Sequence, residues 1–403
     1  MARMLRKLQH KVAPQEKNPA ERPPGKDYIL IFLIMLSILV IGASWEIFDT
    51  VMLSMYILLT ISLILTYTRR HAAHRLSEVQ MMLVTRGSFV TIGMAAALFL
   101  LDAYALIYRA YYAFIKAPRF DSKGRNTSAV FGFVLMLEDL LSKENPEEIA
   151  VVFDPAGGTF RHREYPAYKA QREETPEGIR IAVPLSRELL AAYRIPAVEV
   201  PDFEADDVIG TLSDLAARAG HEVLMVTPDK DYGQLVTEHV RMYRPMQGGG
   251  YEIWGEAEIR EKFGLDSPAQ VIDYLALLGD KVDNIPGCKG IGEKGAQKLL
   301  SEYGTVENLL AHASEIKGAT GKKLIEGADD IRLSYYLATI RRDVPIHYEP
   351  GAYSLQPKDE EAVRELFEAL EFRTLLSRVL GSKPAPAPKA ADLPADDLFA
   401  SLE

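Results

Sequence analysis

The chain has 403 residues, a length typical of two or three domains, which excludes a single small module. Its one cysteine, Cys288, excludes an internal disulfide, and no Cys/His cluster has the spacing of a structural zinc site. Residues 1–93 hold 11 Lys and Arg against 6 Asp and Glu, whereas residues 94–403 hold 35 against 50. We therefore expect two chemically different parts, one basic and one acidic.

Residues 1–26 are polar and basic, a composition that predicts a disordered arm. Two uncharged apolar runs follow, 28–44 and 51–67, and each would span about 26 Å as a helix, the short end of a membrane span. Acids lie between the runs and basic residues lie outside them. The positive-inside rule thus predicts a transmembrane hairpin over 27–69 with both ends cytoplasmic, then a linker over 70–93. A buried helical pair in a soluble domain is the alternative.

Three short apolar runs predict buried strands, and an aspartate follows each of them: 97–101 before Asp102, 148–153 before Asp154, and 222–228 before Asp229. Helical patterns lie between and after these strands, at 126–142, 184–193 and 204–219. This order predicts an α/β fold with a parallel sheet. Because ligands of such sheets bind at the carboxyl ends of the strands, we expect the three aspartates to lie close together.

Further carboxylates occur in tight sets at Glu204-Ala-Asp206-Asp207, Asp229-Lys-Asp231 and Asp280-Lys-Val-Asp283. Crowded acids repel one another, and hard divalent cations such as Mg²⁺ or Mn²⁺, which prefer oxygen ligands, would neutralise them. Two such ions about 4 Å apart activate a water and hold the attacking and leaving oxygens of a phosphodiester. The first set also opens a helix, where the helix dipole alone favours acids. A metal site and simple helix-start acids are therefore both compatible with that one set.

Eight strings within residues 94 to about 380 follow one another in a familiar order: Phe99–Arg109, Val151–Asp154, Phe160–His162, Tyr168–Ala170, Glu204–Asp207, Thr227–Asp231, Gly279–Gly287 and Gly290–Lys294. On these strings the chain resembles the 5'-nuclease (flap endonuclease) domain that opens bacterial DNA polymerase I. The resemblance implies a PIN-like α/β nuclease domain at 94–267, with a helical arch at about 156–185. It also implies a helix-hairpin-helix (H3TH) DNA-binding domain at 268–382. Residues 383–403 have the composition of a disordered tail.

The same resemblance implies the roles of individual side chains. All nine carboxylates that hold the metals in that family have a counterpart here: Asp102, Asp154, Glu204, Asp206, Asp207, Asp229, Asp231, Asp280 and Asp283. Lys169 and Arg172 match arch positions that contact phosphate, and we expect them to act in catalysis. The implied cofactors are two Mg²⁺ or Mn²⁺ ions.

The segment Gly290-Ile-Gly-Glu-Lys-Gly295 matches the G-x-G-x-x-G pattern, but no strand precedes it, so a dinucleotide site is disfavoured. A glycine hairpin between two helices fits better, with free backbone amides that bind a DNA phosphate. The resemblance implies such a hairpin, together with a bound K⁺ ion. Gly295 departs from the family, which commonly has a hydroxyl residue there. We expect four hairpin residues to bind nucleic acid: Lys289, Gly290, Gly292 and Lys294.

A basic segment over 156–180 follows the second predicted strand, and a solvated charged loop is the plain interpretation. Directly after a metal-binding strand end, it is better interpreted as a clamp for single-stranded DNA, in which Arg161 contacts the nucleic acid. Four tyrosines lie on one face of the first predicted helix, at positions 104, 108, 111 and 112. Such a stripe is commonly core, but Tyr108, with the neighbouring Arg109, is predicted to contact the terminal bases.

These features together predict a metal-dependent, structure-specific 5'-3' exonuclease or flap endonuclease of DNA replication and repair. Its expected substrates are 5' flaps and nicked or branched duplexes, with a polymerase domain or a polymerase in trans as a partner. A membrane-tethered DNA-binding module without catalysis is the alternative. Residues 1–93 match nothing in that family, and Met94 looks like a natural start. The nuclease is expected in the cytoplasm. If residues 1–93 are genuine and not the result of a misassigned translation start, it is expected to be anchored to the membrane through 27–69.

Overall fold

The computed structural model describes residues 97–246 and 249–381. The chain divides into two compact units, 1–88 and 89–403, and all the described residues belong to the second. The predicted arm, transmembrane hairpin, linker and tail lie outside the described residues. Among those that are described, no helix combines the length and the apolar character that crossing a bilayer requires.

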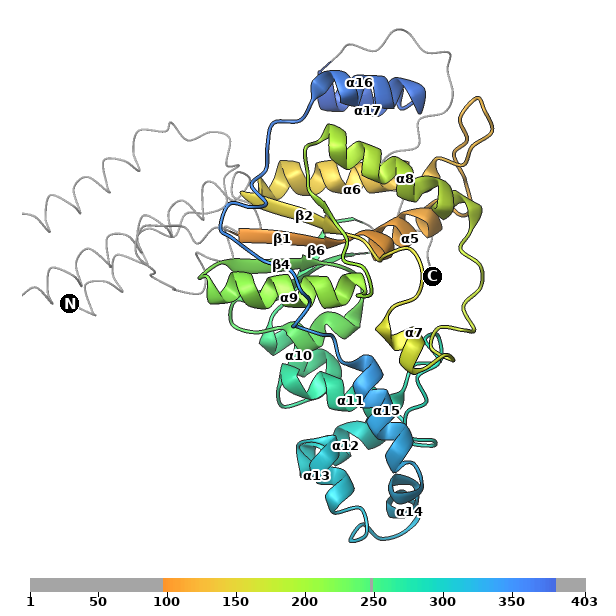
Figure 1. Ribbon diagram of the computed structural model, residues 1–403, viewed down its shortest axis with the longest axis vertical. Coiled ribbons are helices and arrows are strands. Elements are labelled where there is room, and N and C mark those ends of the chain that lie inside the picture. Colours follow the sequence, from red (N-terminus) through yellow and green to blue (C-terminus); the bar gives the residue numbers. More distant parts are fainter. Residues whose placement is uncertain (1–96, 247–248, 382–403) are drawn as a thin grey trace, which may run out of the picture. The chain divides into compact units, whose positions relative to one another are not determined.

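A six-stranded sheet forms the centre of the described part, in the order β3-β2-β1-β4-β5-β6 (Figure 1). Its strands are β1 (Ala97–Asp102), β2 (Glu148–Val152), β3 (Ala197–Val198), β4 (Glu222–Val226), β5 (Val240–Pro245) and β6 (Tyr251–Trp254). The three predicted strands are confirmed as the adjacent parallel strands β2, β1 and β4. The sheet is mixed, however, because the edge strand β6 pairs antiparallel with β5. The prediction of a parallel sheet therefore holds for every pair but this one.

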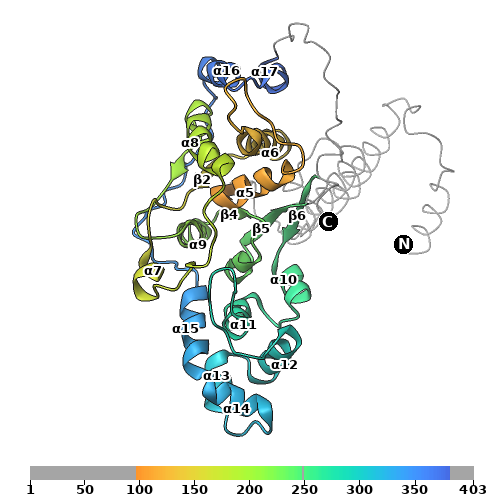
Figure 2. The ribbon, with the colours of Figure 1, turned by 90° about the vertical axis from the view of Figure 1, so that its right-hand side faces the viewer.

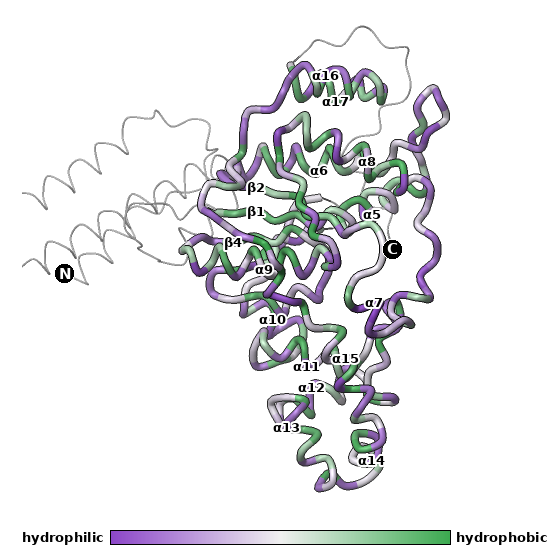
Figure 3. Tube along the Cα trace, in the orientation of Figure 1, coloured by the Kyte–Doolittle hydropathy of each residue, from purple (hydrophilic) through white to green (hydrophobic). Residues whose placement is uncertain are grey.

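Helices cover both faces of the sheet. Three helices, α5 (Ala103–Ala113), α6 (Ser128–Glu144) and α8 (Glu177–Ala192), pack together on one face, and α9 (Ala205–Arg218) packs on the other (Figures 1 and 2). Because strand side chains alternate between faces, Leu98 and Leu100 join the same buried cluster as Val208 and Leu212 of α9. Figure 3 shows the result as apolar β1, β2 and β4 between more polar helices.

A second group of helices continues from the sheet: α10 (Glu256–Phe263), α11 (Val271–Leu278), α12 (Glu293–Tyr303), α13 (Val306–Ala311), α14 (Ala319–Glu326) and α15 (Ala328–Ala338). Two short 3₁₀ helices occur as well: Lys230–Leu235 lies between β4 and β5 in the chain, and Pro268–Gln270 lies between α10 and α11. Leu300 and Leu324 belong to the same buried cluster as the strand residue Leu100. The helical part therefore shares one hydrophobic core with the sheet, and this core fixes where its loops lie.

The chain then returns to the α/β part. The backbone N–H of Ile149 donates to Tyr353 O at 2.9 Å, and that of Leu355 donates to Glu147 O at 2.9 Å. Two last helices follow, α16 (Glu360–Ala369), which packs on α8, and α17 (Arg373–Leu380). The chain that follows α15 thus completes the α/β part. These residues nevertheless lie within 268–382, the span predicted for the helix-hairpin-helix domain.

Candidate active site

The three strand-end aspartates lie in one pocket. Asp102, Asp154 and Asp229 come from the carboxyl ends of β1, β2 and β4, which are neighbours in the sheet. They line a pocket of about 890 Å³ together with Glu204 and Asp206 at the start of α9. The parallel strand order therefore produces the convergence that the sequence predicts.

Hydrogen bonds hold these carboxylates in place. Asp102 caps α5: its Oδ1 accepts from Ala105 N at 3.1 Å, while its Oδ2 accepts from the hydroxyls of Thr227 and Tyr232, both at 3.1 Å. Asp154 Oδ1 accepts from the backbone N–H of Ala205 at 2.7 Å, which ties β2 to the start of α9. Sequence reasoning missed Thr227 and Tyr232 as parts of the site. The sequence offers one indication of their role, since Thr227 and Tyr232 flank Asp229 and Asp231.

The pocket holds more negative charge than the protein neutralises. Burial, followed by the charge of Asp154, raises the pKa of Asp102 to about 7. Burial and the charge of Asp229 likewise raise the pKa of Asp231 to about 7. Asp231 adjoins the pocket, and the pKa values of three acids that line it with Asp102 are raised too, with desolvation as the largest cause: Asp154, Asp206 and Asp229. Such a set of acids is suited to bind cations.

The second set of acids adjoins the first. Asp231 Oδ1 is buried and has no hydrogen-bond partner within the described residues. The charges of Asp283 and Asp280 add to the rise in the pKa of both Asp229 and Asp231, so these four acids are near neighbours. Asp280 Oδ1 also accepts from Val282 N at 2.7 Å, which fixes the loop after α11.

Within the described parts of the chain, no three acidic, histidine or cysteine side chains are arranged as a ready-made metal site. Two of the acids are paired with basic side chains of the protein. Lys169 Nζ lies 2.7 Å from Glu204 Oε1, and Arg172 Nε donates to Asp283 Oδ1 at 3.0 Å. The oxygen-only donor set, its excess charge and the unpartnered Asp231 oxygen fit hard divalent cations.

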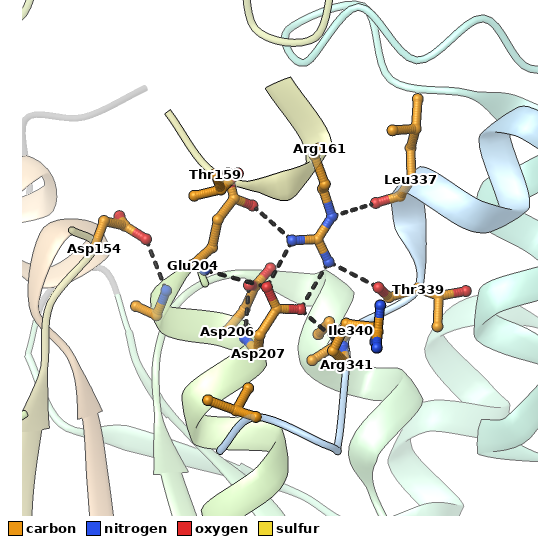
Figure 4. Close-up of polar contacts among 12 residues, drawn as sticks. Asp154, Thr159, Arg161, Glu204, Asp206, Asp207, Leu337, Thr339, Ile340 and Arg341 are labelled. Atoms are coloured by element: carbon orange, nitrogen blue, oxygen red, sulfur yellow. Dashed lines mark hydrogen bonds and ion pairs between the residues drawn. The ribbon is translucent and has the colours of Figure 1, made fainter. Parts of the chain in front are cut away.

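Arg161 and Asp207 do not have the predicted roles. Arg161 is 1 % exposed and donates to both oxygens of Asp207, at 2.7 and 2.8 Å, and to Leu337 O and Thr339 O, at 3.0 and 2.8 Å (Figure 4). The prediction that Arg161 contacts nucleic acid is therefore wrong, because all of its polar atoms are engaged inside the protein. Figure 2 shows that the short helix that carries it, α7 (Phe160–Glu164), lies beside α15.

Asp207 points away from the pocket, into this buried network. Besides Arg161, its oxygens accept from the backbone N–H groups of Arg341 at 2.8 Å and Glu204 at 3.2 Å. The residue is fully buried, and its side chain is not part of the pocket lining. Its neighbour Asp206 lines the pocket instead. Asp207 is thus placed to hold the start of α9 in position and not to bind a metal.

The arch residues Lys169 and Arg172 line the same pocket. Their turn is attached to the loop after α11: Lys169 N donates to Asp283 O at 3.0 Å, and Asn284 Nδ2 donates to Ala167 O at 2.8 Å. Lys169 has a φ of +55°, a left-handed conformation that a lysine rarely adopts. The backbone contacts hold it there and place its ammonium between Glu204 and Asp283.

The predicted nucleic-acid contacts lie in two places. Tyr104, Tyr108 and Tyr112 of α5 line the pocket, whereas Arg109 lies outside it and donates to Met246 O. The hairpin residues are exposed in the loop between α11 and α12 and at the start of α12: Lys289, Gly290, Gly292 and Lys294. The loop over 279–292 thus joins two separate features: its start lines the pocket, and its end forms the glycine hairpin.

Comparison with known proteins agrees with this geometry. Family models described as the 5'-3' exonuclease N-terminal resolvase-like domain and the 5'-3' exonuclease C-terminal SAM fold match residues 97–264 and 266–361. The 5'-3' exonuclease of Aquifex aeolicus is 36% identical over 282 residues, which cover 70% of this chain and 94% of that protein. DNA polymerase I of Bacillus caldotenax is 42% identical over 288 residues, 71% of this chain, but this is only 32% of that polymerase.

A likeness in fold extends to a solved structure of the bacteriophage T5 D15 flap endonuclease in complex with DNA and metal ions. It has a TM-score of 0.51 and 20% identity, and it covers 71% of this chain and 98% of that one. At this identity the likeness supports the fold alone. The two matched family models and the near full-length match to the Aquifex protein carry the assignment. The chain therefore belongs to the 5'-3' exonuclease family.

Proposed function

We propose that this pocket hydrolyses DNA phosphodiesters near 5' ends, with divalent metal ions, on 5' flaps and nicked or branched duplexes. The observation that carries the proposal is the composition of the pocket. Seven carboxylates, four tyrosines and the basic arch side chains of Lys169 and Arg172 are among the residues that line one space of about 890 Å³. Acids bind cations, the basic side chains fit a phosphate, and the aromatic rings fit bases, so each component of a nucleic acid cleavage site has a counterpart.

Two groups of carboxylates would hold the ions. Four acids at the ends of β1 and β2 and the start of α9 form the first group: Asp102, Asp154, Glu204 and Asp206. Four acids after β4 and α11 form the second: Asp229, Asp231, Asp280 and Asp283. Asp207 is left out of both groups, because Arg161 and two backbone amides occupy its oxygens. Mg²⁺ or Mn²⁺, when bound, would supply an activated water and charge neutralisation at the phosphodiester.

The arch cations would change partners when DNA enters. Lys169 and Arg172 are now paired with Glu204 and Asp283, two of the proposed metal ligands. A scissile phosphate in the pocket offers these cations a second acceptor and leaves both carboxylates to the metals. In that position they would stabilise the negative charge that develops on the phosphate during hydrolysis. The side chain of Arg172 is the more exposed of the two.

The tyrosines and the glycine hairpin would position the substrate. Tyr104, Tyr108 and Tyr112 fit the bases next to the cleaved bond, because every base has a face that stacks on an aromatic ring. The exposed hairpin would hold the duplex backbone through amides and lysines, without reading sequence. Together they would set the distance between the duplex and the pocket.

The relatives suggest a biological setting. The chain spans about a third of the length of the DNA polymerase I proteins that it matches. We infer that it acts with a polymerase, either in trans or as part of one chain, in DNA replication and repair. The membrane anchor over 27–69 stays a proposal, and co-sedimentation of the full chain with membranes after alkaline carbonate treatment tests it.

Cleavage of an end-labelled 5'-flapped duplex tests the proposed function, with a fully paired blunt duplex and a 3'-flapped duplex as matched substrates. We expect cleavage near the base of the 5' flap with Mg²⁺ or Mn²⁺. Equal cleavage of the 3' flap, or cleavage that persists in EDTA, would contradict the proposal.

A further inference from the structure

The glycine hairpin, residues 288–295, combines backbone N–H groups that have no acceptor among the described residues with a carbonyl oxygen, that of Gly290, that already accepts a hydrogen bond. Within the described part of the chain, no acceptor occupies the backbone N–H groups of Gly290 and Gly292. Gly292 directly precedes the eleven-residue helix α12, whose first N–H groups have no partner inside the helix. The hairpin therefore offers several N–H donors to an external anion, as the proposed binding of a DNA phosphate requires.

A lysine from a different helix reaches this hairpin. Lys323 of α14 donates from Nζ to Gly290 O at 2.9 Å, across 33 residues of sequence. The helix is held against the hairpin on both sides of that contact. Leu324 is fully buried, and the thiol of Cys288 lies 3.7 Å from Lys323 O. These contacts fix the backbone of α14 beside the hairpin, and the exposed side chain of Lys323 reaches Gly290 O from there.

The glycine at position 290 makes the contact possible. Its φ is +82°, a conformation that side chains disfavour. A Cβ built there would lie 2.7 Å from Lys323 Nζ and 3.1 Å from Lys323 Cε. Any other residue would therefore push the ammonium away from the carbonyl oxygen.

A free K⁺ ion, expected here from the family resemblance, does not fit these residues. The ammonium occupies Gly290 O, Cys288 O accepts from Ile291 N at 3.0 Å, and Gly292 O accepts from the N–H groups of Gly295 and Ala296, both at 2.9 Å. Gly295 offers no side-chain hydroxyl as an additional oxygen ligand. Carbonyl oxygens that replace the hydration shell of K⁺ need to be available together, and in this hairpin those of residues 288, 290 and 292 already accept hydrogen bonds.

We propose that Lys323 is the built-in cation of the glycine hairpin: its ammonium takes the place of a free K⁺ ion and adds positive charge where the hairpin binds a DNA phosphate. An ammonium has three N–H donors, and the contact with Gly290 uses one. The other two face water in the free protein or a phosphate oxygen in the complex. This inference rests on the proposed DNA-binding function, since it names the group that supports that binding.

Fluorescence anisotropy of the full chain on a labelled 5'-flapped duplex tests the inference, with Ca²⁺ in place of Mg²⁺ to prevent cleavage. The Kd is measured in NaCl and in KCl at equal ionic strength. We expect the wild-type chain to bind equally well in both salts, within about twofold, because its cation is covalently attached. Lys323→Met should weaken binding about fivefold in NaCl and lower the salt slope by about 1. Addition of KCl or methylammonium should restore part of the lost affinity.

Lys322→Met is the matched control. Lys322 precedes Lys323 on the same helix, carries the same charge, and lies 3.7 Å from Glu326 on the exposed side. Its replacement should leave the Kd unchanged. A wild-type chain that binds tightly only in K⁺, or a Lys323→Met variant that behaves like Lys322→Met, would overturn the inference alone. A wild-type chain that binds no flapped duplex in either salt would overturn the proposed function, and the inference with it.

Discussion

The pocket and the glycine hairpin, the two proposed nucleic-acid sites, differ in their chemistry. The pocket presents side chains, among them Asp102, Asp206 and Asp229, whose pKa values are raised by burial and by the charges of neighbouring acids. The hairpin is built from backbone amides, with exposed lysines around it and Lys323 attached to a carbonyl oxygen. If these sites act as proposed, cleavage of the phosphodiester depends on acids that need bound cations, whereas binding of the duplex depends on backbone donors that are already in place. Changes in the pocket should therefore affect turnover, and changes in the hairpin should affect affinity.

The largest effect should come from the proposed metal ligands. Asp206→Ala or Asp229→Ala should lower the cleavage rate by about 10³-fold or more, because loss of a bound metal removes several kcal/mol of transition-state stabilisation. Binding of the flapped duplex, measured by anisotropy in Ca²⁺, should survive. Asp214→Ala is the control, since Asp214 lies on the same helix but pairs with Arg218 on the surface. Full activity of either pocket variant would remove these acids from the metal site.

A cation in the pocket should matter more for turnover than for affinity. Lys169→Ala should reduce kcat by about a hundredfold and change KM by less than about threefold, because a charge at the scissile phosphate acts mainly as the transition state forms. Steady-state kinetics on the flapped duplex separate the two constants. Arg180→Ala, in the same basic segment but outside the pocket lining, should leave both unchanged. A rise in KM with normal kcat would mean that Lys169 contributes to substrate binding and not to the chemical step.

The crowding of acids should also appear as a stability effect in the absence of metal. Asp102 has a folded-state pKa of about 7, against about 3.9 in an unfolded chain, so its contribution to stability is present below about pH 4 and is lost as the pH rises to about 7. Asparagine does not ionise. Asp102→Asn should thus stabilise the metal-free fold at pH 8 by on the order of 2 kcal/mol while it abolishes cleavage.

Thermal unfolding in EDTA at pH 4.5 and pH 8 measures this effect. The variant should melt a few degrees above the wild type at pH 8 and close to it at pH 4.5. An equal difference at both pH values would mean that charge repulsion at Asp102 is not its source.

The smallest effect should come from a single hairpin lysine. Lys294→Ala should weaken duplex binding several-fold and reduce the salt slope by about 1, with kcat unchanged at saturating substrate. Lys143→Ala, on α6 and paired with Asp139, provides the control. An unchanged slope would exclude Lys294 from the DNA interface.

Local patterns predicted the features that depend on one element at a time. The strands before Asp102, Asp154 and Asp229 have continuous apolar runs, and parallel order brings their ends together. The strands β5 and β6 were missed because polar residues interrupt them. Arg241 in β5, for example, is buried only because it pairs with Glu222 of the neighbouring strand.

Pairings between distant residues could not be predicted in the same way. Arg161 and Asp207 are 46 positions apart, and nothing in either local pattern shows that each neutralises the other inside the protein. The return of the chain to β2 depends on backbone hydrogen bonds of Tyr353 and Leu355, which any sequence could form. Which carboxylate faces the pocket and which faces the core is therefore a property of the packed structure.

The central claim is that the acid pocket is a metal-dependent phosphodiesterase site. The most direct measurement is single-turnover cleavage of a 5'-end-labelled flapped duplex by the full chain, in parallel with Mg²⁺, with Ca²⁺ and with EDTA. We expect cleavage near the base of the flap with Mg²⁺, and binding without cleavage in Ca²⁺ and in EDTA. Cleavage of equal rate in EDTA, or none with Mg²⁺ or Mn²⁺ under conditions where the duplex is fully bound, would contradict it.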